Sequence, residues 1–304
     1  MKQNIRINLI PTFKCNKSCD YCIYKPYLSN TSVADLFWID SALGTISRQF
    51  NIIQITLTGG ELSLLSDLYF TMLYNIAKIY CKKIVVETNF IKINPAIINC
   101  CDIINVGYNF DDNLNKTTIY NNIKAASNCD KIINVKTIDI FCKDNPIEII
   151  NQLNNLKIKS WEIIPYHMTQ NSKIPFKSYT DHEEIINSYL KLSNKMKFAF
   201  QNKLQLEGIL QFDNYNTKTI FLTPNKTFGI GNFKNNEFFI DETDNFAIIL
   251  EKMNKMEKKF EKICEKCTSK LHCMSNYFLN LDYKGKSCCG FKNLLENNVS
   301  KRGT

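Results

Sequence analysis

Three cysteines near the amino end are spaced closely enough to bind one metal centre. Cys15, Cys19 and Cys22 are separated by three and by two residues, and the aromatic Tyr21 precedes the last of them. Thiolates are the usual ligands of iron–sulfur clusters and of many zinc sites. A structural site is normally closed by four protein ligands, whereas three leave one metal position open for chemistry. The spacing therefore indicates a reactive metal centre.

Three other interpretations compete with this one. A structural zinc site needs a fourth Cys or His, and none lies nearby in the sequence. Buried thiols that only fill the core have no reason to keep this spacing. A chance match to a short pattern is the remaining alternative, and a second motif at the expected distance along the chain argues against it.

That second motif lies about one strand–helix unit downstream. Residues 52–57 form a short, β-branched apolar run that predicts a buried strand. The run leads directly into Thr58-Gly59-Gly60-Glu61. Glycines let the backbone approach a ligand closely, and a carboxylate with carbonyl oxygens suits an ammonium group. A glycine pair after a strand is usually only a turn, so its position after the cysteines gives it weight.

The two motifs together resemble the radical S-adenosylmethionine (radical SAM) superfamily. The resemblance implies a [4Fe–4S] cluster on Cys15, Cys19 and Cys22, whose open iron binds S-adenosylmethionine. It also implies that one electron from the cluster releases a 5′-deoxyadenosyl radical, which takes a hydrogen atom from the substrate. The Gly-Gly-Glu turn would contact the amino group of the cofactor. The cofactor carries the difficult chemistry, while the protein orients it.

The same resemblance assigns further residues to cofactor binding. Thr88 and Asn89 end a predicted strand at 83–86, where many members have Thr-Asn-Gly, but Phe90 replaces that glycine here. Asn109 and Asp111 follow the predicted strand 102–106, with Asn109 in place of a serine. We include Tyr21 in this set. Polar residues at the start of ordinary loops are the alternative explanation for each of these positions.

Alternating strands and helices define the expected fold. Further strands are predicted at 132–141 and 160–166, and helical patterns at 32–50, 64–80, 114–127 and 146–156. Such alternation predicts parallel strands with right-handed crossovers. We therefore expect an α/β protein: a partial (β/α)6 TIM-like barrel over residues 1–170, and a smaller α+β iron–sulfur domain over residues 171–304. Each motif falls at the carboxyl end of a strand, where barrel sites lie.

Composition bounds the class of protein. The 304 residues contain no long apolar run and no amino-terminal signal peptide, so we expect a cytoplasmic protein without a membrane span. Thirteen cysteines without an export signal indicate metal thiolates in a reducing compartment. The net charge of +9 would suit nucleic acid, but the lysines are scattered. We attribute the charge to a lysine-rich composition and expect no nucleic-acid partner.

A second group of cysteines follows an amphipathic helix predicted at 246–263. Cys264, Cys267 and Cys273 have the spacing C-x2-C-x5-C, and Cys288 and Cys289 come later. The group resembles the SPASM extension of radical SAM peptide maturases. The resemblance implies one auxiliary [4Fe–4S] cluster on Cys264, Cys267, Cys273 and either Cys288 or Cys289. A zinc knuckle with four cysteines is the competing interpretation.

The SPASM pattern is incomplete in this chain. Tyr277 stands where the last cysteine of the core pattern would be, and no cysteine lies between Cys142 and Cys264 to bind another auxiliary cluster. The spare member of the 288–289 pair, for which we single out Cys289, or Cys142 could instead donate a hydrogen atom to a substrate radical. A buried thiol is the simpler explanation. His182, in the first turn of a predicted helix, indicates no function.

Three functions remain in competition at this point. The resemblance favours modification of a ribosomally made peptide by crosslinking, thioether formation, epimerisation or oxidation. It also allows oxidation of a small metabolite such as a sugar or aminoglycoside. In both cases the partners would be the substrate and an electron donor such as flavodoxin or ferredoxin. The third function is a non-catalytic iron–sulfur protein, and the intact Glu61 and three leading cysteines argue against it.

Overall fold

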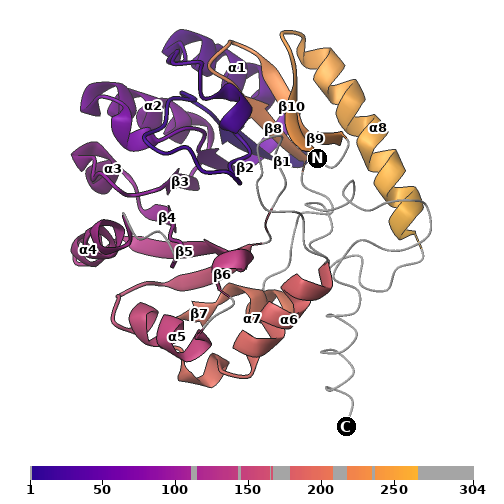
Figure 1. Cartoon of the computed structure of the whole chain (residues 1–304). Coiled ribbons are helices and arrows are strands. Elements are labelled where there is room, and N and C mark those ends of the chain that lie inside the picture. Colours follow the sequence, from indigo (N-terminus) through magenta and orange to yellow (C-terminus); the bar gives the residue numbers. More distant parts are fainter. Residues whose placement is uncertain are drawn as a thin grey trace.

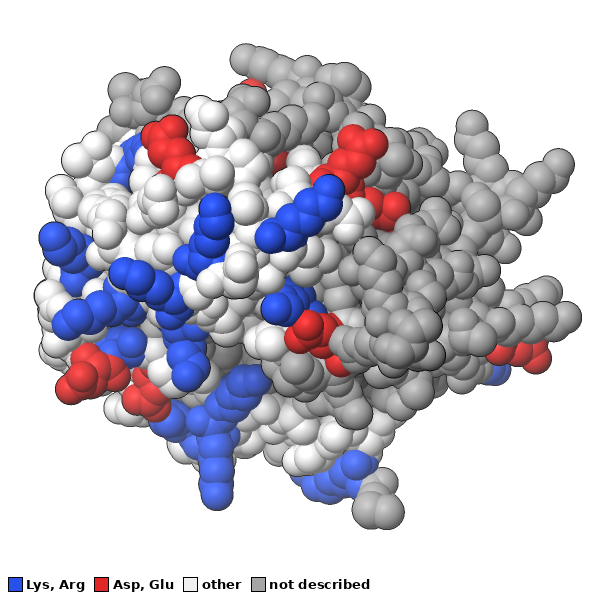
Figure 2. Space-filling view, turned by 90° about the horizontal axis from the view of Figure 1, so that it is seen from below, with Lys and Arg blue, Asp and Glu red and all other residues white. Residues whose placement is uncertain are grey.

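The structure is a computed structural model, and it describes most of the first 265 residues. The described ranges are 2–110, 115–142, 145–164, 166, 179–207, 218–234 and 237–265. Within these ranges no helix is long and apolar enough to cross a membrane. Lysine and arginine side chains are spread among uncharged atoms over the face in Figure 2, with acidic side chains between some of them.

All the strands of the described residues belong to one ten-stranded sheet (Figure 1). Their order across the sheet is β10-β9-β8-β1-β2-β3-β4-β5-β6-β7. The first six strands pair in parallel in the order of the sequence, which confirms the predicted partial barrel. The bounds are β1 (Gln3–Leu9), β2 (Phe50–Leu57), β3 (Ile84–Thr88), β4 (Ile103–Gly107), β5 (Ile132–Ile138), β6 (Ser160–Ile164), β7 (Ala199–Phe200), β8 (Lys218–Leu222), β9 (Phe228–Lys234) and β10 (Glu237–Thr243).

Helices connect the parallel strands and cover the outer side of the sheet (Figure 1). Figure 1 shows α1 to α5 in sequence order around that side, and α8 beside the β8–β10 end. Their bounds are α1 (Leu36–Gln49), α2 (Asp67–Tyr80), α3 (Pro95–Cys100), α4 (Lys116–Ala126), α5 (Pro146–Asn154), α6 (Tyr179–Leu190), α7 (Gln201–Leu206) and α8 (Phe246–Cys264). The 3-10 turns are η1 (Lys25–Tyr27), η2 (Leu62–Leu64), η3 (Asp139–Phe141) and η4 (Ser193–Lys195).

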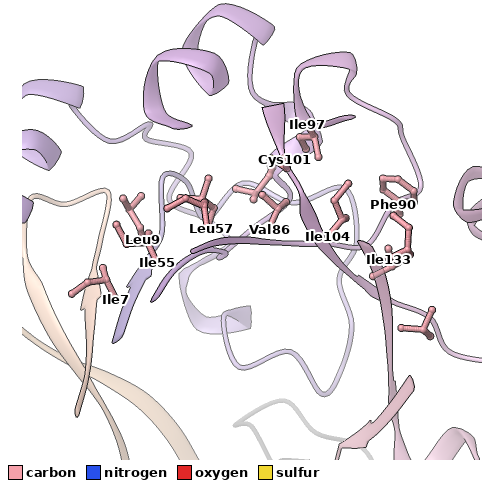
Figure 3. Close-up of a cluster of buried hydrophobic side chains, with 14 of the residues drawn as sticks. Ile7, Leu9, Ile55, Leu57, Val86, Phe90, Ile97, Cys101, Ile104 and Ile133 are labelled. Atoms are coloured by element: carbon pink, nitrogen blue, oxygen red, sulfur yellow. The ribbon is translucent and has the colours of Figure 1, made fainter. Parts of the chain in front are cut away.

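The main core lies between the sheet and these helices. Alternate residues of each strand point outward, and neighbouring strands contribute Ile7, Ile55, Val86, Ile104 and Ile133, all buried (Figure 3). Strands alternate their side chains between two faces, so the intervening residues face the inside of the barrel. The inward set is largely polar, which is unlike the packed branched residues that fill a closed TIM barrel. It includes Asn8, Gln54, Glu87, Asn105, Asn134, Lys136 and Glu162.

The carboxyl-terminal part of the described chain extends the barrel sheet. β8 pairs in parallel with β1, with Ile7 opposite Ile220, and β9 and β10 follow as antiparallel neighbours. All three strands lie within residues 171–304, for which the sequence analysis expects a smaller α+β domain. The domain boundary at residue 170 stays a prediction. Strands from both sides of that boundary belong to the same hydrogen-bonded sheet.

Trp161 on β6 is the largest fully buried side chain of the described residues. Its indole nitrogen donates to the Thr137 hydroxyl at 3.0 Å, and its ring meets that of Tyr189 edge-on at 4.9 Å between centroids. Further contacts with Phe110 and Phe200 fix this end of the core.

We expect Trp161→Ala to lower the free energy of unfolding by about 3–5 kcal/mol, because it opens a cavity and leaves Thr137 without its donor. Phe37→Ala is the control, since Phe37 is 89% exposed and its removal should change stability by less than about 0.5 kcal/mol. Urea unfolding curves measure both. Equal midpoints for the two variants would contradict this account of the core.

Candidate cofactor and metal site

The cysteine loop, which we define as residues 11–35, follows β1 at the carboxyl end of the sheet. The loop is held there by backbone hydrogen bonds to the turn after β2. Gly60 N–H donates to the Thr12 carbonyl and Glu61 N–H to the Lys14 carbonyl, both at 2.8 Å. The two sequence motifs therefore lie in direct contact.

Only glycine permits this contact. A Cβ at Gly60 would lie 2.1 Å from the Lys14 carbonyl oxygen, and one at Gly59 would lie 2.4 Å from Cγ2 of Ile10. Gly59 also has φ of +120°, a conformation that side chains disfavour. The glycine pair therefore has a structural function: it lets the turn pack directly against Ile10 and the backbone of the cysteine loop.

Glu61 connects the same turn to the end of β3. Its carboxylate is 1% exposed and accepts hydrogen bonds from Ser63 N–H at 2.9 Å, the Thr88 hydroxyl at 2.6 Å and Asn89 N–H at 2.7 Å. Charge-assisted bonds of this kind are among the strong ones. Because the side chain is committed to the protein, the groups of this turn that remain for a ligand are backbone carbonyls.

Asn89 carries the connection on to the cysteine loop. Its side-chain amide donates to Oδ1 of Asn16 at 2.7 Å and lies 3.9 Å from the Cys15 sulfur. The next residue, Phe90, has φ of +55° and is buried, so it takes the left-handed conformation that glycine adopts more readily. The Asn122 amide of α4 donates to the Phe90 carbonyl at 2.9 Å and stabilises this turn.

The three thiols influence one another electrostatically. The pKa of Cys22 is raised to about 12, mainly by burial and to a smaller extent by the neighbouring Cys19 and Cys15. Burial also raises the pKa of Cys15, with smaller contributions from Glu61 and Cys19. All three are half-buried and unpaired by disulfides. A metal that binds here would therefore displace the protons of Cys15 and Cys22.

The donor set consists of three thiols, and thiolates are the usual ligands of iron–sulfur clusters. Across the described residues, no three His, Cys, Asp or Glu side chains converge tightly enough to share one ion. In a cubane each cysteine binds a different iron, so the sulfur atoms stand further apart. The backbone turn in which Cys22 N–H donates to the Cys19 carbonyl at 3.2 Å places these residues in one compact loop. Cys15, Cys19 and Cys22 could therefore hold three irons of a [4Fe–4S] cluster.

An aromatic wall stands beside the loop. Tyr21 meets the rings of Phe141 and Tyr166 edge-on, at 5.4 and 6.4 Å between centroids. The Asn109 amide donates to the Tyr21 hydroxyl, and Ile138 N–H donates to the Asn109 side-chain oxygen at 3.4 Å. The structure thus joins two predicted cofactor residues, Tyr21 and Asn109, at the ends of β4 and β5.

An ion pair inside the barrel was not predicted from the sequence. Lys136 on β5 reaches across β4 to the Glu87 carboxylate on β3 at 2.7 Å, and passes over Gly107, which is exposed. Burial opposes ionisation of Glu87, but the Lys136 ammonium and hydrogen bonds from Lys136, Thr58 and Asn105 hold its pKa below its usual range. Thr58 immediately precedes the glycine pair, so this charge pair lies directly beside the proposed cofactor site.

A second buried pair also went unpredicted. His182 Nδ1 of α6 lies 2.8 Å from Oδ2 of Asp139, and both side chains are nearly inaccessible. The other oxygen of Asp139 accepts from Ile140 N–H at 2.7 Å and Tyr166 N–H at 3.0 Å. Asp139 therefore ties together the chain after β5, the chain after β6 and α6, and it supports the aromatic wall.

The remaining predicted residues are only partly described. Cys142 is buried in the main core and its carbonyl accepts from the Tyr189 hydroxyl at 2.9 Å, so its suggested role as a hydrogen-atom donor stays a prediction. Cys264 is the last residue of α8, and its side chain is outside the described set. The positions beyond the described residues are Asp111, Cys267, Cys273, Cys288 and Cys289.

Solved structures with the same fold support this description. SuiB from Streptococcus suis, solved with S-adenosylmethionine and with the precursor peptide SuiA, superposes with a TM-score of 0.57 at 13–14% identity. The alignment covers 75% of this chain but only about 60% of SuiB. The enzyme anSMEcpe with bound AdoMet gives a TM-score of 0.69 at 12% identity, over 99% of this chain and 96% of its own.

A third similar structure is coproporphyrinogen III oxidase (HemN) from Escherichia coli, a radical SAM enzyme, with a TM-score of 0.51 at 12% identity over 91% of this chain and 81% of HemN. Neither the protein-family models nor the curated proteins give a match to the sequence. The chain therefore has the fold of radical SAM enzymes.

We expect Gly60→Ala to weaken the contact between the glycine turn and the cysteine loop, because its Cβ would overlap the Lys14 backbone. Thermal unfolding should occur several degrees lower, and iron bound after anaerobic reconstitution should fall at least twofold. Gly44→Ala in α1 is the matched control. Its Cβ meets only the Tyr80 ring at 3.4 Å or more, so it should be neutral or stabilising by up to about 1 kcal/mol. Equal iron contents in the two variants would contradict this structural function of Gly60.

Proposed function

We propose that this chain is a radical SAM enzyme that modifies a ribosomally made peptide. In this proposal Cys15, Cys19 and Cys22 hold a [4Fe–4S] cluster, and S-adenosylmethionine binds beside it. The main observation behind the proposal is the backbone hydrogen bonding between the Gly-Gly-Glu turn and the cysteine loop, at the carboxyl ends of β1 and β2. A chance match between two short motifs would not require this contact.

The residues of the chain have separable functions in this site. When bound, the cluster would supply one electron to cleave a C–S bond of S-adenosylmethionine and release a 5′-deoxyadenosyl radical. Carbonyl groups of Gly59 and Gly60 are suited to accept from the cofactor ammonium group. Lys136 is half-buried and pairs with Glu87, which accepts a hydrogen bond from Thr58 next to the glycine pair, so its ammonium group is suited to attract the carboxylate of the cofactor.

The aromatic wall would protect the radical. Tyr21, Phe141 and Tyr166 cover the ends of β4 to β6 with apolar surface. Exclusion of water from a reactive site prevents side reactions. Thr88, Asn89, Asn109 and, beyond the described residues, Asp111 complete the proposed cofactor set.

Two observations support a peptide substrate. SuiB was solved with its precursor peptide SuiA, and anSMEcpe with a Cp18Cys peptide. The alignment with the peptide-bound anSMEcpe structure covers 98% of this chain. The polar inner face of the barrel suits a ligand rich in hydrogen-bonding groups, such as a peptide backbone. A small-metabolite substrate is the second candidate, since HemN, named for its action on a porphyrinogen, has the same fold.

The auxiliary centre belongs to the same proposal. A [4Fe–4S] cluster on Cys264, Cys267, Cys273 and Cys288 or Cys289 would be closed by four thiolates, which suits electron transfer or support better than catalysis. The remaining cysteine of that pair, or Cys142, is the proposed hydrogen-atom donor. A cytoplasmic flavodoxin or ferredoxin would supply electrons.

We expect Cys15→Ala, Cys19→Ala and Cys22→Ala each to abolish formation of 5′-deoxyadenosine, because a missing thiolate detaches one iron of the cluster. Chromatography of the anaerobic, dithionite-reduced reaction measures the product. Cys129→Ala, which removes an exposed thiol, should leave the rate unchanged. Product formation by any of the three variants at the unmodified rate would refute the proposed function.

The substrate class has its own test. Each short peptide encoded beside this gene is co-expressed with the chain, and its mass is measured in ordinary and in heavy water. A loss of two hydrogens indicates oxidation or crosslinking, and a gain of one deuterium indicates epimerisation. Unchanged peptides, together with active cleavage of S-adenosylmethionine, would favour the small-metabolite candidate.

A further inference from the structure

The cysteine loop rests on a small core of its own. Ile10, Phe13 and Tyr24 from the loop region pack with Phe221 of β8 and Ile240 of β10, and all five are buried. Cys22, Ile23 and Tyr27 pack against the same cluster. This small core is separate from the main core between the sheet and its outer helices. One of the three proposed cluster thiols, that of Cys22, therefore packs against a core to which β8 and β10 contribute side chains.

Tyr27 makes the most specific contact in this small core. Its ring stacks on Phe13 with centroids 4.9 Å apart and planes 20° apart. Its hydroxyl accepts a hydrogen bond from Ile240 N–H at 2.9 Å. β10 is the edge strand of the described sheet, so an outward amide on it would otherwise lack a strand partner. The Tyr27 hydroxyl of the cysteine loop thus gives the Ile240 amide of the edge strand a hydrogen-bond acceptor.

Two polar contacts hold the far part of the loop against the turn between β8 and β9. The Asn30 amide donates to Oδ1 of Asn225 at 2.6 Å, and Lys226 pairs with Asp35 at 2.8 Å. The hairpin itself is braced by Thr227, whose hydroxyl donates to the Glu242 carboxylate at 2.6 Å. The β8–β10 segment therefore contacts the loop at its apolar base and at its polar end.

We propose that Tyr27 is a positioning residue through which edge strand β10 fixes the shape of the cysteine loop. The inference deepens the proposed function and rests on it in one respect, namely that Cys15, Cys19 and Cys22 bind iron. β10 leads directly into α8, and α8 ends at Cys264. The strand that supports the amino-terminal cysteine loop is thus followed directly by the helix that ends at the first of the carboxyl-terminal cysteines.

The coupling has to act in both directions. If β10 stabilises the loop in its metal-binding shape, then metal in the loop stabilises β10 by the same free energy. Binding of iron and sulfide at the three thiols should therefore slow the opening of a strand that supplies none of their ligands. A tyrosine that only fills space would not transmit this effect.

Hydrogen exchange followed by mass spectrometry tests the proposal on the full-length chain. The variant Tyr27→Phe keeps the ring and removes the hydroxyl acceptor. In the metal-free chain we expect exchange of residues 11–30 and of β10 to become roughly three- to tenfold faster, as the loss of one hydrogen bond implies. Tyr80→Phe is the matched control, because its hydroxyl donates to Asp40 at 2.7 Å, away from the loop. It should leave both segments unchanged.

The second arm compares the metal-free chain with the chain reconstituted with iron and sulfide. Iron should slow exchange of β10 in the unmodified protein and in Tyr80→Phe, and at least half of this slowing should be lost in Tyr27→Phe. Unmodified exchange in Tyr27→Phe, or a β10 strand indifferent to iron, would overturn the proposal. If Tyr27→Phe unfolds, Asn225→Ala replaces it. That variant removes the acceptor of Asn30, and it should speed exchange of residues 11–30 about twofold.

Failure of this inference differs from failure of the proposed function. Coupling in the exchange data without any 5′-deoxyadenosine would refute the enzymatic proposal and leave Tyr27 as a positioning residue. Normal 5′-deoxyadenosine formation with no exchange effect in Tyr27→Phe would refute the positioning role of Tyr27 and leave the enzymatic proposal intact. The first arm needs no metal, so it gives a result even if reconstitution is incomplete.

Discussion

The close backbone approach between the glycine turn after β2 and the cysteine loop after β1 is the contact on which the rest of the site depends. Two hydrogen bonds of 2.8 Å form it, and a side chain at Gly60 would prevent it. The adjacent parallel pairing of β1 and β2 brings the two segments to the same edge of the sheet. Without this contact, the part of the loop that carries Cys15 would lose its connection to the turn after β2, and contacts with the β8–β10 segment would be left to hold the loop.

Glu61 extends that contact into a network. Three donors from two segments converge on its buried carboxylate, and Asn89 passes the arrangement on to Asn16 beside the first cysteine. A buried carboxylate with satisfied oxygens rigidifies its surroundings, because leaving any donor unpaired would be costly. Glu61, the acidic residue of the motif, therefore holds several segments together. The turn at Phe90, with its positive φ, lies beside it and is stabilised by the surrounding hydrogen bonds.

Local patterns made the barrel predictable, and they also singled out the candidate metal site, whose ligands stay a prediction. Strands β2, β3 and β4 are short runs rich in Ile and Val, and the cysteines of the loop are neighbours in the sequence. The short elements α3 and β7 carry too few residues for a clear period, and β10 was missed although Phe238, Phe239 and Ile240 form an apolar run. Lys136–Glu87 and His182–Asp139 join residues 49 and 43 positions apart. Such pairs depend on strand register and on where α6 packs, which no local pattern specifies.

The pairing of β8 with β1 has a consequence for the order of events during synthesis. Leu9 opposes Leu222, so β1, which pairs with β2 on one side, obtains its partner on the other side only after more than two hundred further residues have been made. At translation rates of roughly 5–20 residues per second, that interval is about 10–40 s. The small core under the thiols is therefore incomplete throughout this time. For the cluster proposed on Cys15, Cys19 and Cys22, assembly is therefore expected only after β8 to β10 have been synthesised and can support the loop.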